Sequence, residues 1–111
     1  MDYKIKSRIW IEANGKVLLG EGRIKLLIAI DEKGSLSKAA KSMEMSYKKA
    51  WNLVDSINNS AKEPVVSKTT GGKGGGGAVL TNHGKKLINI FETINTNCWK
   101  YLDSQLKTID L

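Results

Sequence analysis

Residues 34–58 read GSLSKAAKSMEMSYKKAWNLVDSIN and carry the signals of two consecutive short helices. Ser35 and Ser46 are both favourable N-caps, because a serine hydroxyl accepts a hydrogen bond from a free N–H of the first helical turn. The sequence therefore predicts one helix from Leu36 to Met43 and a second from Tyr47 to Asn58, joined by a tight turn. The second helix has the apolar spacing of an amphipathic helix, formed by Ala50, Leu53, Val54 and Ile57.

The segment before this helix pair predicts a β-hairpin over residues 1–20 and one further helix. Asn14-Gly15 is a strong signal for a type I′ turn, because both central residues of that turn need a positive φ. A helix is expected from Arg23 to Lys33, and Gly34 is well placed to end it in a left-handed conformation. The period-two pattern of the first strand is formed by Ile5, Ile9 and Ile11.

The segment after the helix pair predicts two short strands, VVSKTT (65–70) and AVLT (78–81), joined by the loop GGKGGGG (71–77). Thr81 is a plausible N-cap for one long helix over residues 82–111. Apolar residues in this helix recur at alternating spacings of four and three, as in a packing seam. The seam consists of Leu87, Phe91, Ile94, Cys98 and Tyr101.

This order of elements predicts a mainly α fold with small β elements (α+β), the winged helix-turn-helix. We expect a single domain over residues 1–111, made of an N-terminal β-hairpin (1–20), a helix-turn-helix core with its wing (22–81) and a C-terminal dimerisation helix (82–111).

Composition narrows the possible partners. The chain has 18 Lys and Arg against 11 Asp and Glu, a net charge of +7, which favours a polyanion such as nucleic acid. Charge alone leaves open that the lysines only keep the chain soluble. No apolar run approaches the roughly 18–20 residues of a membrane span, and the start lacks the core of a signal peptide. The single Cys98 fits a reducing compartment, so we expect the cytoplasm and no membrane partner.

The sequence shows no pattern of residues that is typical of an enzyme active site. No Ser-His-Asp, paired-carboxylate or metal-ligand spacing is present, so no catalytic residue, metal or cofactor is expected. The glycine loop formally matches a dinucleotide fingerprint, but that motif leads from a strand into a helix, whereas here a β-like segment follows. The loop is better interpreted as the tip of the wing, where Lys73, together with Lys68 on the strand, could reach a phosphate.

The second helix of the pair is the candidate recognition helix. Helical geometry places Lys48, Asn52 and Asp55 directly opposite the apolar face. A cation and an amide there suit phosphates and base edges, although a solvated face would have the same pattern. Tyr47 and Trp51 are interpreted as packing residues rather than as platforms for bases.

Two segments, GSLSKAAKSMEMSYKKAWNLVDSIN and TTGGKGGGGAVLTNHGKKLI, closely resemble the N-terminal DNA-binding domain of the ModE family of molybdate-responsive regulators. The domain is also similar to the winged helix of LysR-type regulators, and the likeness covers about residues 22–91. It implies a winged helix, homodimerisation through the first and last helices, and a palindromic operator in double-stranded DNA. It also implies DNA contacts by Ser46, Tyr47, Lys48, Lys49 and Asn52 on the recognition helix and by Lys68, Thr70 and Lys73 on the wing.

The departures from the family bear on function. Family members continue into a molybdate-binding module, whereas this sequence ends at Leu111, so molybdate sensing is not inherited from the resemblance. Glu44 stands in the turn where many helix-turn-helix proteins have glycine. We expect a sequence-specific DNA-binding transcriptional regulator, with a link to molybdenum or oxyanion metabolism suggested by the family alone. The alternatives are a winged-helix adaptor that binds protein and a nucleotide-binding protein that uses the glycine loop.

Overall fold

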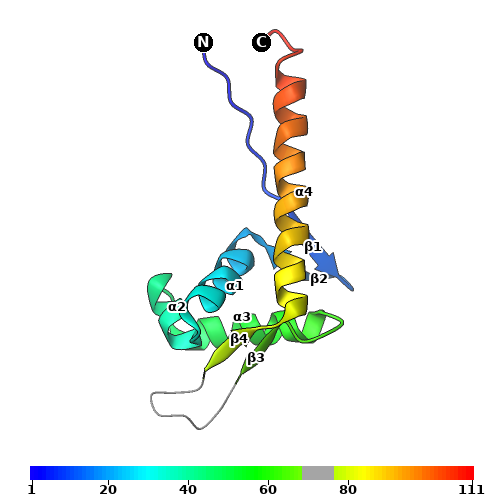
Figure 1. The fold of residues 1–111 in the computed structure, drawn as a ribbon. Helices are drawn as coiled ribbons and strands as arrows, with labels where there is room; N and C mark the ends of the chain where they lie inside the picture. Colours follow the sequence, from blue (N-terminus) through cyan, green and yellow to red (C-terminus); the bar gives the residue numbers. More distant parts are fainter. Residues whose placement is uncertain (69–76) are drawn as a thin grey trace.

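The computed structural model describes residues 1–68 and 77–111 and has the predicted winged-helix architecture (Figure 1). Three helices and two small antiparallel sheets form a body, from which one long helix projects. The predicted loop at 71–77 falls mostly outside the described residues. In chain order the elements are β1 (Trp10–Ala13), β2 (Lys16–Gly20), α1 (Glu21–Lys33), α2 (Leu36–Ser42), α3 (Tyr47–Ser60), β3 (Val66–Lys68), β4 (Ala78–Leu80) and α4 (Asn82–Leu106).

The N-terminal hairpin is shorter than the sequence pattern predicts. β1 begins at Trp10, so Ile5 and Ile9 lie before the strand rather than in it. The reason is that β2 ends at Gly20, where α1 follows at once, and the first nine residues have no strand to pair with. The turn itself is confirmed, because Asn14 and Gly15 have φ angles of 54° and 79°.

The start of α1 also differs from the prediction, since the helix begins at Glu21, two residues early. Its end is confirmed: Gly34 has φ 66°, and its N–H donates to the Ile30 carbonyl at 2.8 Å. Glycine suits this position because a left-handed conformation costs residues with a Cβ about 1–2 kcal/mol.

Both predicted serine caps are confirmed. The Lys38 N–H donates to Ser35 Oγ at 3.3 Å, and the Lys49 N–H donates to Ser46 Oγ at 3.1 Å. The turn between α2 and α3 has Glu44 at φ 53°, the left-handed region in which glycine is usual. Glu44 therefore adopts the conformation usual for glycine at this position, at the expense of local backbone strain.

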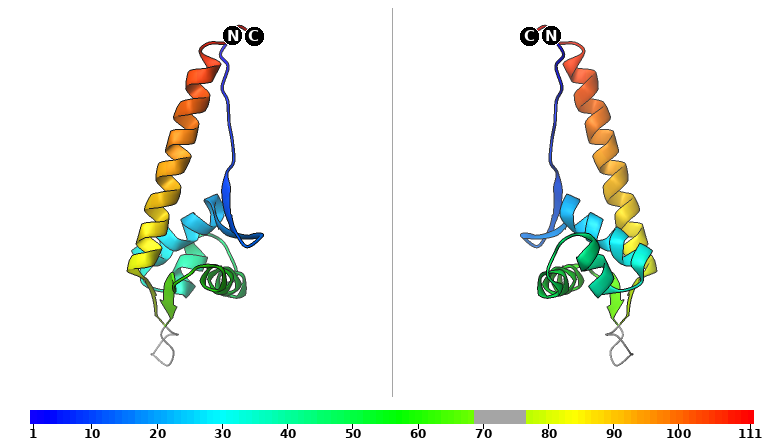
Figure 2. Two further views of the ribbon diagram at one scale, coloured as in Figure 1. Left: turned by 90° about the vertical axis from the view of Figure 1, so that its right-hand side faces the viewer. Right: turned by 90° about the vertical axis from the view of Figure 1, so that its left-hand side faces the viewer.

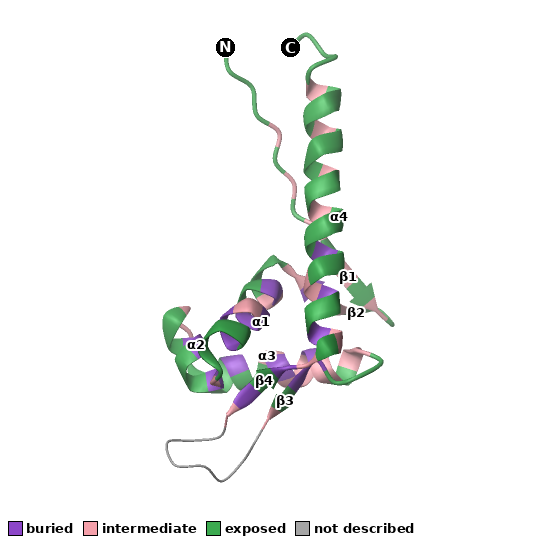
Figure 3. Cartoon of the chain, in the orientation of Figure 1, coloured by how far each residue is buried: buried purple, intermediate pink, exposed green. Residues whose placement is uncertain are grey.

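The core is formed by α1, α2, α3 and the two strands of the wing, completed by Leu19 of β2 and by Leu87 and Phe91 of α4 (Figure 3). Among the described residues, all buried side chains are apolar. Ala39, Ala40 and Ala50 have 0–2% of their surface exposed, which shows how closely the helices of the helix-turn-helix approach. The largest side chains with less than 2% exposure are Leu19, Leu26, Leu27, Ile30, Leu36, Ile57, Val54 and Val65.

The wing is fastened to the helical body at two places. The Ala78 N–H donates to the Gly34 carbonyl at 3.5 Å, which ties β4 to the turn before α2. On the other strand, Asn58 of α3 accepts the N–H groups of Val65 and Val66 at 2.8 and 3.1 Å and donates to the Val66 carbonyl at 2.9 Å. These contacts fix the base of the wing against the end of α3.

The long helix α4 belongs to the body only at its beginning. Its cap is confirmed, since the Gly84 N–H donates to Thr81 Oγ1 at 3.0 Å. Only Gly84, Leu87 and Phe91 are buried in it, whereas Ile94 is 47% exposed. The helix ends at Leu106, and the N-terminal segment extends toward the same end of the molecule (Figure 2). The radius of gyration is 16.8 Å, against about 13 Å for a compact chain of this length.

Candidate nucleic-acid interface

The burial of the inner face of α3 determines which residues of this helix face outward. Ala50, Val54 and Ile57 are all fully buried, so the helix cannot turn about its axis without exposing them. Lys48 and Asn52 consequently project from the body and are exposed. Asp55, predicted on the same face, is half-buried, and one of its carboxylate oxygens accepts a hydrogen bond from Asn59 Nδ2 at 3.4 Å.

Most of the predicted site residues lie at the N-terminal end of α3. Ser46, Tyr47, Lys48, Lys49 and Asn52 are all exposed and follow one another along about one and a half turns. The N–H groups of the first turn add a partial positive charge, which favours phosphate. The arrangement offers cations, an amide and helix N–H groups on one surface.

The two aromatic side chains of α3 differ from their interpretation as packing residues. Tyr47 is 53% exposed and Trp51 is 40% exposed, so neither belongs to the core. The ammonium of Lys68 on β3 lies 3.9 Å from the centroid of the Trp51 ring. This cation–π contact, of the kind worth about 0.5–1 kcal/mol at exposed sites, holds a wing lysine beside α3.

The wing residues predicted for DNA contact are only partly described. Lys68 is half-buried at the end of β3, whereas Thr70 and Lys73 lie outside the described residues. Of these three residues, the structure places only Lys68, which lies next to α3.

The lysines around α3 form no ion pair with any carboxylate within the described residues. Within residues 1–68 and 77–111 the ion pairs are Lys25 with Glu21 and His83 with Glu63, at 3.5 and 3.6 Å. Lys48, Lys49 and the α2 lysines Lys38 and Lys41 therefore have no carboxylate partner there. Exposed lysines on α2 and α3 of a chain with net charge +7 form an electrostatic footprint suited to a polyanion.

Sequence reasoning missed two residues that shape this surface. The sequence predicts Asn58 only as the last residue of its helix, yet Asn58 makes three hydrogen bonds to the wing backbone. The sequence predicts Arg23 only as the first residue of a helix, yet its guanidinium donates a hydrogen bond to Ser56 Oγ of α3 at 3.1 Å. The signal for Asn58 would have been a polar residue in the last turns of an amphipathic helix that is followed closely by a strand. No local sequence signal distinguishes Arg23.

Other kinds of site find no support in the described part of the chain. No group of three or more His, Cys, Asp or Glu within it is placed to hold a metal ion. Among the helices described, none has the length and apolar character needed to cross a membrane.

Comparison with known proteins identifies the family. The chain is 36% identical over 97 residues to the molybdenum transport protein ModE of Azotobacter vinelandii, covering 87% of this chain and 36% of that protein. It is 45% identical over 93 residues to the molybdenum-pterin-binding protein MopB of Rhodobacter capsulatus, covering 84% of this chain and 34% of that protein. The chain carries a ModE-family domain.

A third relative is the DNA-binding transcriptional dual regulator ModE of Escherichia coli, 42% identical over 79 residues, covering 71% of this chain and 30% of that protein. The ModE-family domain thus spans about a third of the length of the relatives it matches, in their N-terminal DNA-binding region. No family model matches the chain. The resemblance inferred from the two sequence segments is confirmed.

Proposed function

We propose that this ModE-family domain is the DNA-reading part of a transcriptional regulator and has no catalytic role. The observation that carries the proposal is the outer face of α3, where Lys48 and Asn52 are exposed. The lysines around them form no ion pair within residues 1–68 and 77–111. In this proposal α3 lies in the major groove while α2 braces it across the backbone. Lys48 and Lys49 contact phosphates, and the Asn52 amide pairs with a base edge, for which adenine is the usual partner.

The wing adds contacts beside the groove. Lys68 is held next to α3 by the Trp51 ring, so it is positioned to meet the phosphate backbone at the edge of the same groove. We assign Thr70 and Lys73, which lie outside the described residues, to the neighbouring backbone or minor groove. These contacts add affinity for any sequence rather than selectivity.

We further propose that the domain acts as a homodimer on a palindromic operator. The support is the unpartnered half of α4, where Ile94 and Tyr101 of the predicted seam are 47% and 63% exposed. An apolar seam on a projecting helix is stabilised when a second copy covers it. Two copies related by a two-fold axis would place their α3 helices in half-sites about 34 Å apart, or a multiple of that.

The names of the relatives suggest the target genes. They refer to molybdenum transport and molybdenum-pterin binding, so we propose a role in molybdenum or related oxyanion metabolism. A regulator of this kind acts in the cytoplasm, where the single Cys98 stays reduced.

The proposal is tested by fluorescence anisotropy of a labelled genomic duplex at several salt concentrations. The logarithm of affinity should fall linearly with the logarithm of salt, and Lys48→Ala should reduce the slope by about 0.9, the value for one lost phosphate contact. Lys100→Ala, on the projecting part of α4, is the matched control and should keep the wild-type slope. An affinity independent of salt would instead favour the protein-binding adaptor.

A further inference from the structure

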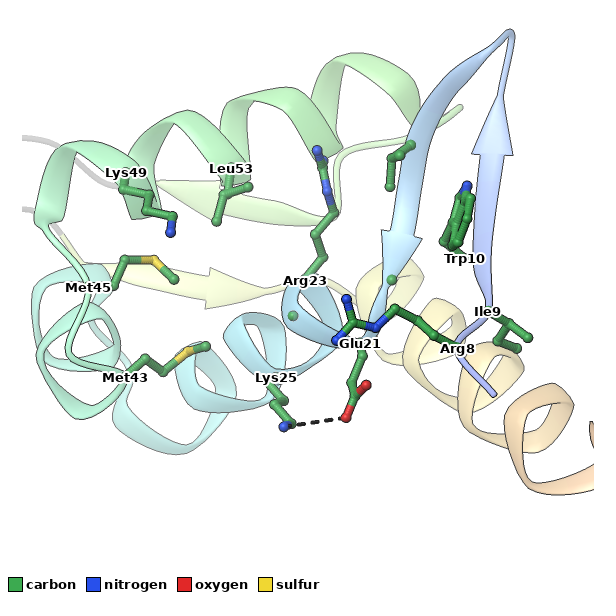
Figure 4. A pocket seen from close by; sticks show the side chains of 13 residues that line it. Arg8, Ile9, Trp10, Glu21, Arg23, Lys25, Met43, Met45, Lys49 and Leu53 are labelled. Atoms are coloured by element: carbon green, nitrogen blue, oxygen red, sulfur yellow. Dashed lines mark ion pairs between the residues drawn. The ribbon is translucent and has the colours of Figure 1, made fainter. Parts of the chain in front are cut away.

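A cavity of about 500 Å³ lies on the side of α3 that faces away from the wing (Figure 4). It is bounded by α3, the first turn of α1, the N-terminal hairpin and the turn between α2 and α3. Lys49 and Leu53 point into it from α3, and Arg8 and Trp10 face it from the hairpin side. Its volume falls in the range of about 300–1,000 Å³ typical of sites for small molecules.

The charges lining the cavity are unbalanced. Four cations line it, namely Arg8, Arg23, Lys25 and Lys49, against one carboxylate, Glu21. That carboxylate is engaged by Lys25 at 3.5 Å (Figure 4). The other three cations form no ion pair with any residue in 1–68 or 77–111. A concave surface with this excess of positive charge attracts anions.

Arg23 is the central cation of the cavity. It is half-buried and donates one hydrogen bond to Ser56 Oγ at 3.1 Å, which fixes its position between α1 and α3. Burial lowers the pKa of its guanidinium, which means that the charge has lost part of its hydration. Because the group remains protonated, its unused N–H donors suit a planar carboxylate that accepts two bonds at once.

The rest of the lining is apolar and adaptable. Trp10 is 55% exposed, and its indole N–H is already satisfied by Glu12 at 2.9 Å, so its ring face remains available. Met43, Met45 and Leu53 are half-buried on the opposite wall. Methionine side chains adjust to the shape of a bound group, and an exposed indole stacks on planar rings.

We propose that this cavity binds a small organic carboxylate whose acidic group pairs with Arg23 and whose apolar, planar body lies between Trp10 and the two methionines. Arg8 and Lys49 provide the surrounding positive charge. Met45 precedes α3 and Lys49 belongs to its first turn, so the occupant contacts the recognition helix itself. A consequence, which rests on the proposed DNA binding, is that the occupied cavity changes the affinity of the domain for DNA.

The site is tested by titrating the isotope-labelled chain with naphthoate, with its neutral isostere naphthamide and with inorganic phosphate, and following backbone amide NMR signals. Naphthoate should shift the signals of residues 8–10, 20–25 and 43–53, while naphthamide should bind at least about tenfold more weakly. Arg23→Met and Arg8→Met should each weaken naphthoate binding. Lys33→Met, at the far end of α1 and outside the cavity lining, should leave it unchanged.

Three results would overturn the proposal. Equal binding of naphthoate and naphthamide would show that no acidic group is recognised. Phosphate alone producing the same shifts as naphthoate would assign the cavity to the DNA backbone. If Arg23→Met fails to fold, unchanged naphthoate binding by Arg8→Met would decide against the site. None of these measurements uses DNA, so a failure here is distinguishable from a failure of the proposed DNA binding.

Discussion

Replacing Asn58 with alanine should destabilise the domain far more than its place near the end of α3 suggests. The Asn58 amide accepts the N–H groups of Val65 and Val66 and donates to the Val66 carbonyl, at 2.8, 3.1 and 2.9 Å. Val65 and Val66 are 0% and 2% exposed, so water does not readily replace the lost partner. The substitution would leave three backbone groups without a bond.

The magnitude follows from those three groups. A net hydrogen bond contributes about 0.5–1.5 kcal/mol, and a buried group left unsatisfied costs about 1–3 kcal/mol. Allowing the variant to relax and admit some water, we expect the free energy of unfolding of Asn58→Ala to fall by about 2–4 kcal/mol. In a domain of this size that corresponds to a fall of roughly 9–17 °C in Tm.

Urea unfolding followed by circular dichroism measures the effect. The protein concentration is kept fixed, because the proposed dimerisation would make stability concentration-dependent. Asn59→Ala is the matched control: Asn59 is the next residue, is exposed and makes a single 3.4 Å bond to Asp55. It should lose less than about 0.5 kcal/mol. A loss of under about 1 kcal/mol in Asn58→Ala, or equal losses in the two variants, would refute the reasoning.

The remaining predictions concern backbone positions. Gly84→Ala should lower the free energy of unfolding in urea by about 2 kcal/mol, because an added Cβ would lie 2.5 Å from the Val65 carbonyl oxygen. Gly22→Ala is the control: its Cβ would meet open space, so the variant should be neutral or stabilised by up to about 1 kcal/mol. Equal effects at the two glycines would contradict the close approach of α4 to the Val65 carbonyl. Ser46→Ala should lose about 1 kcal/mol in thermal unfolding and Ser46→Asp should restore it, whereas no loss would mean that the cap is dispensable. Glu44→Gly should gain up to about 1 kcal/mol by the same measurement, and a loss would show that the left-handed residue is not strained.

Local chemistry explains which parts of the fold could be predicted from the sequence. The caps at Ser35, Ser46 and Thr81, and the left-handed Gly34, are determined by neighbouring backbone groups, and each is found as expected. The boundary of β1 was wrong because a strand needs a partner, and the length of the partner β2 is set by where α1 begins.

The candidate interface was harder to predict because its parts meet only in three dimensions. The outward face of α3 follows from its apolar period, so Lys48 and Asn52 could be placed from the sequence. The contact of Lys68 with the Trp51 ring joins residues seventeen positions apart and could not. The bond from Arg23 to Ser56 crosses from α1 to α3, and the cavity beside it has no sequence signature.

Selection of bound duplexes from a random library tests the central claim most directly, because it asks whether α3 reads sequence. The wild-type chain should enrich a palindrome whose half-sites are centred about 34 Å apart or a multiple of that. Asn52→Ala should lose base preference at one position of each half-site, since removing a bidentate base contact sacrifices about 1–3 kcal/mol of discrimination, while Asn59→Ala should select the wild-type site. Enrichment of no sequence by the wild type, or of the same site by Asn52→Ala, would contradict the account.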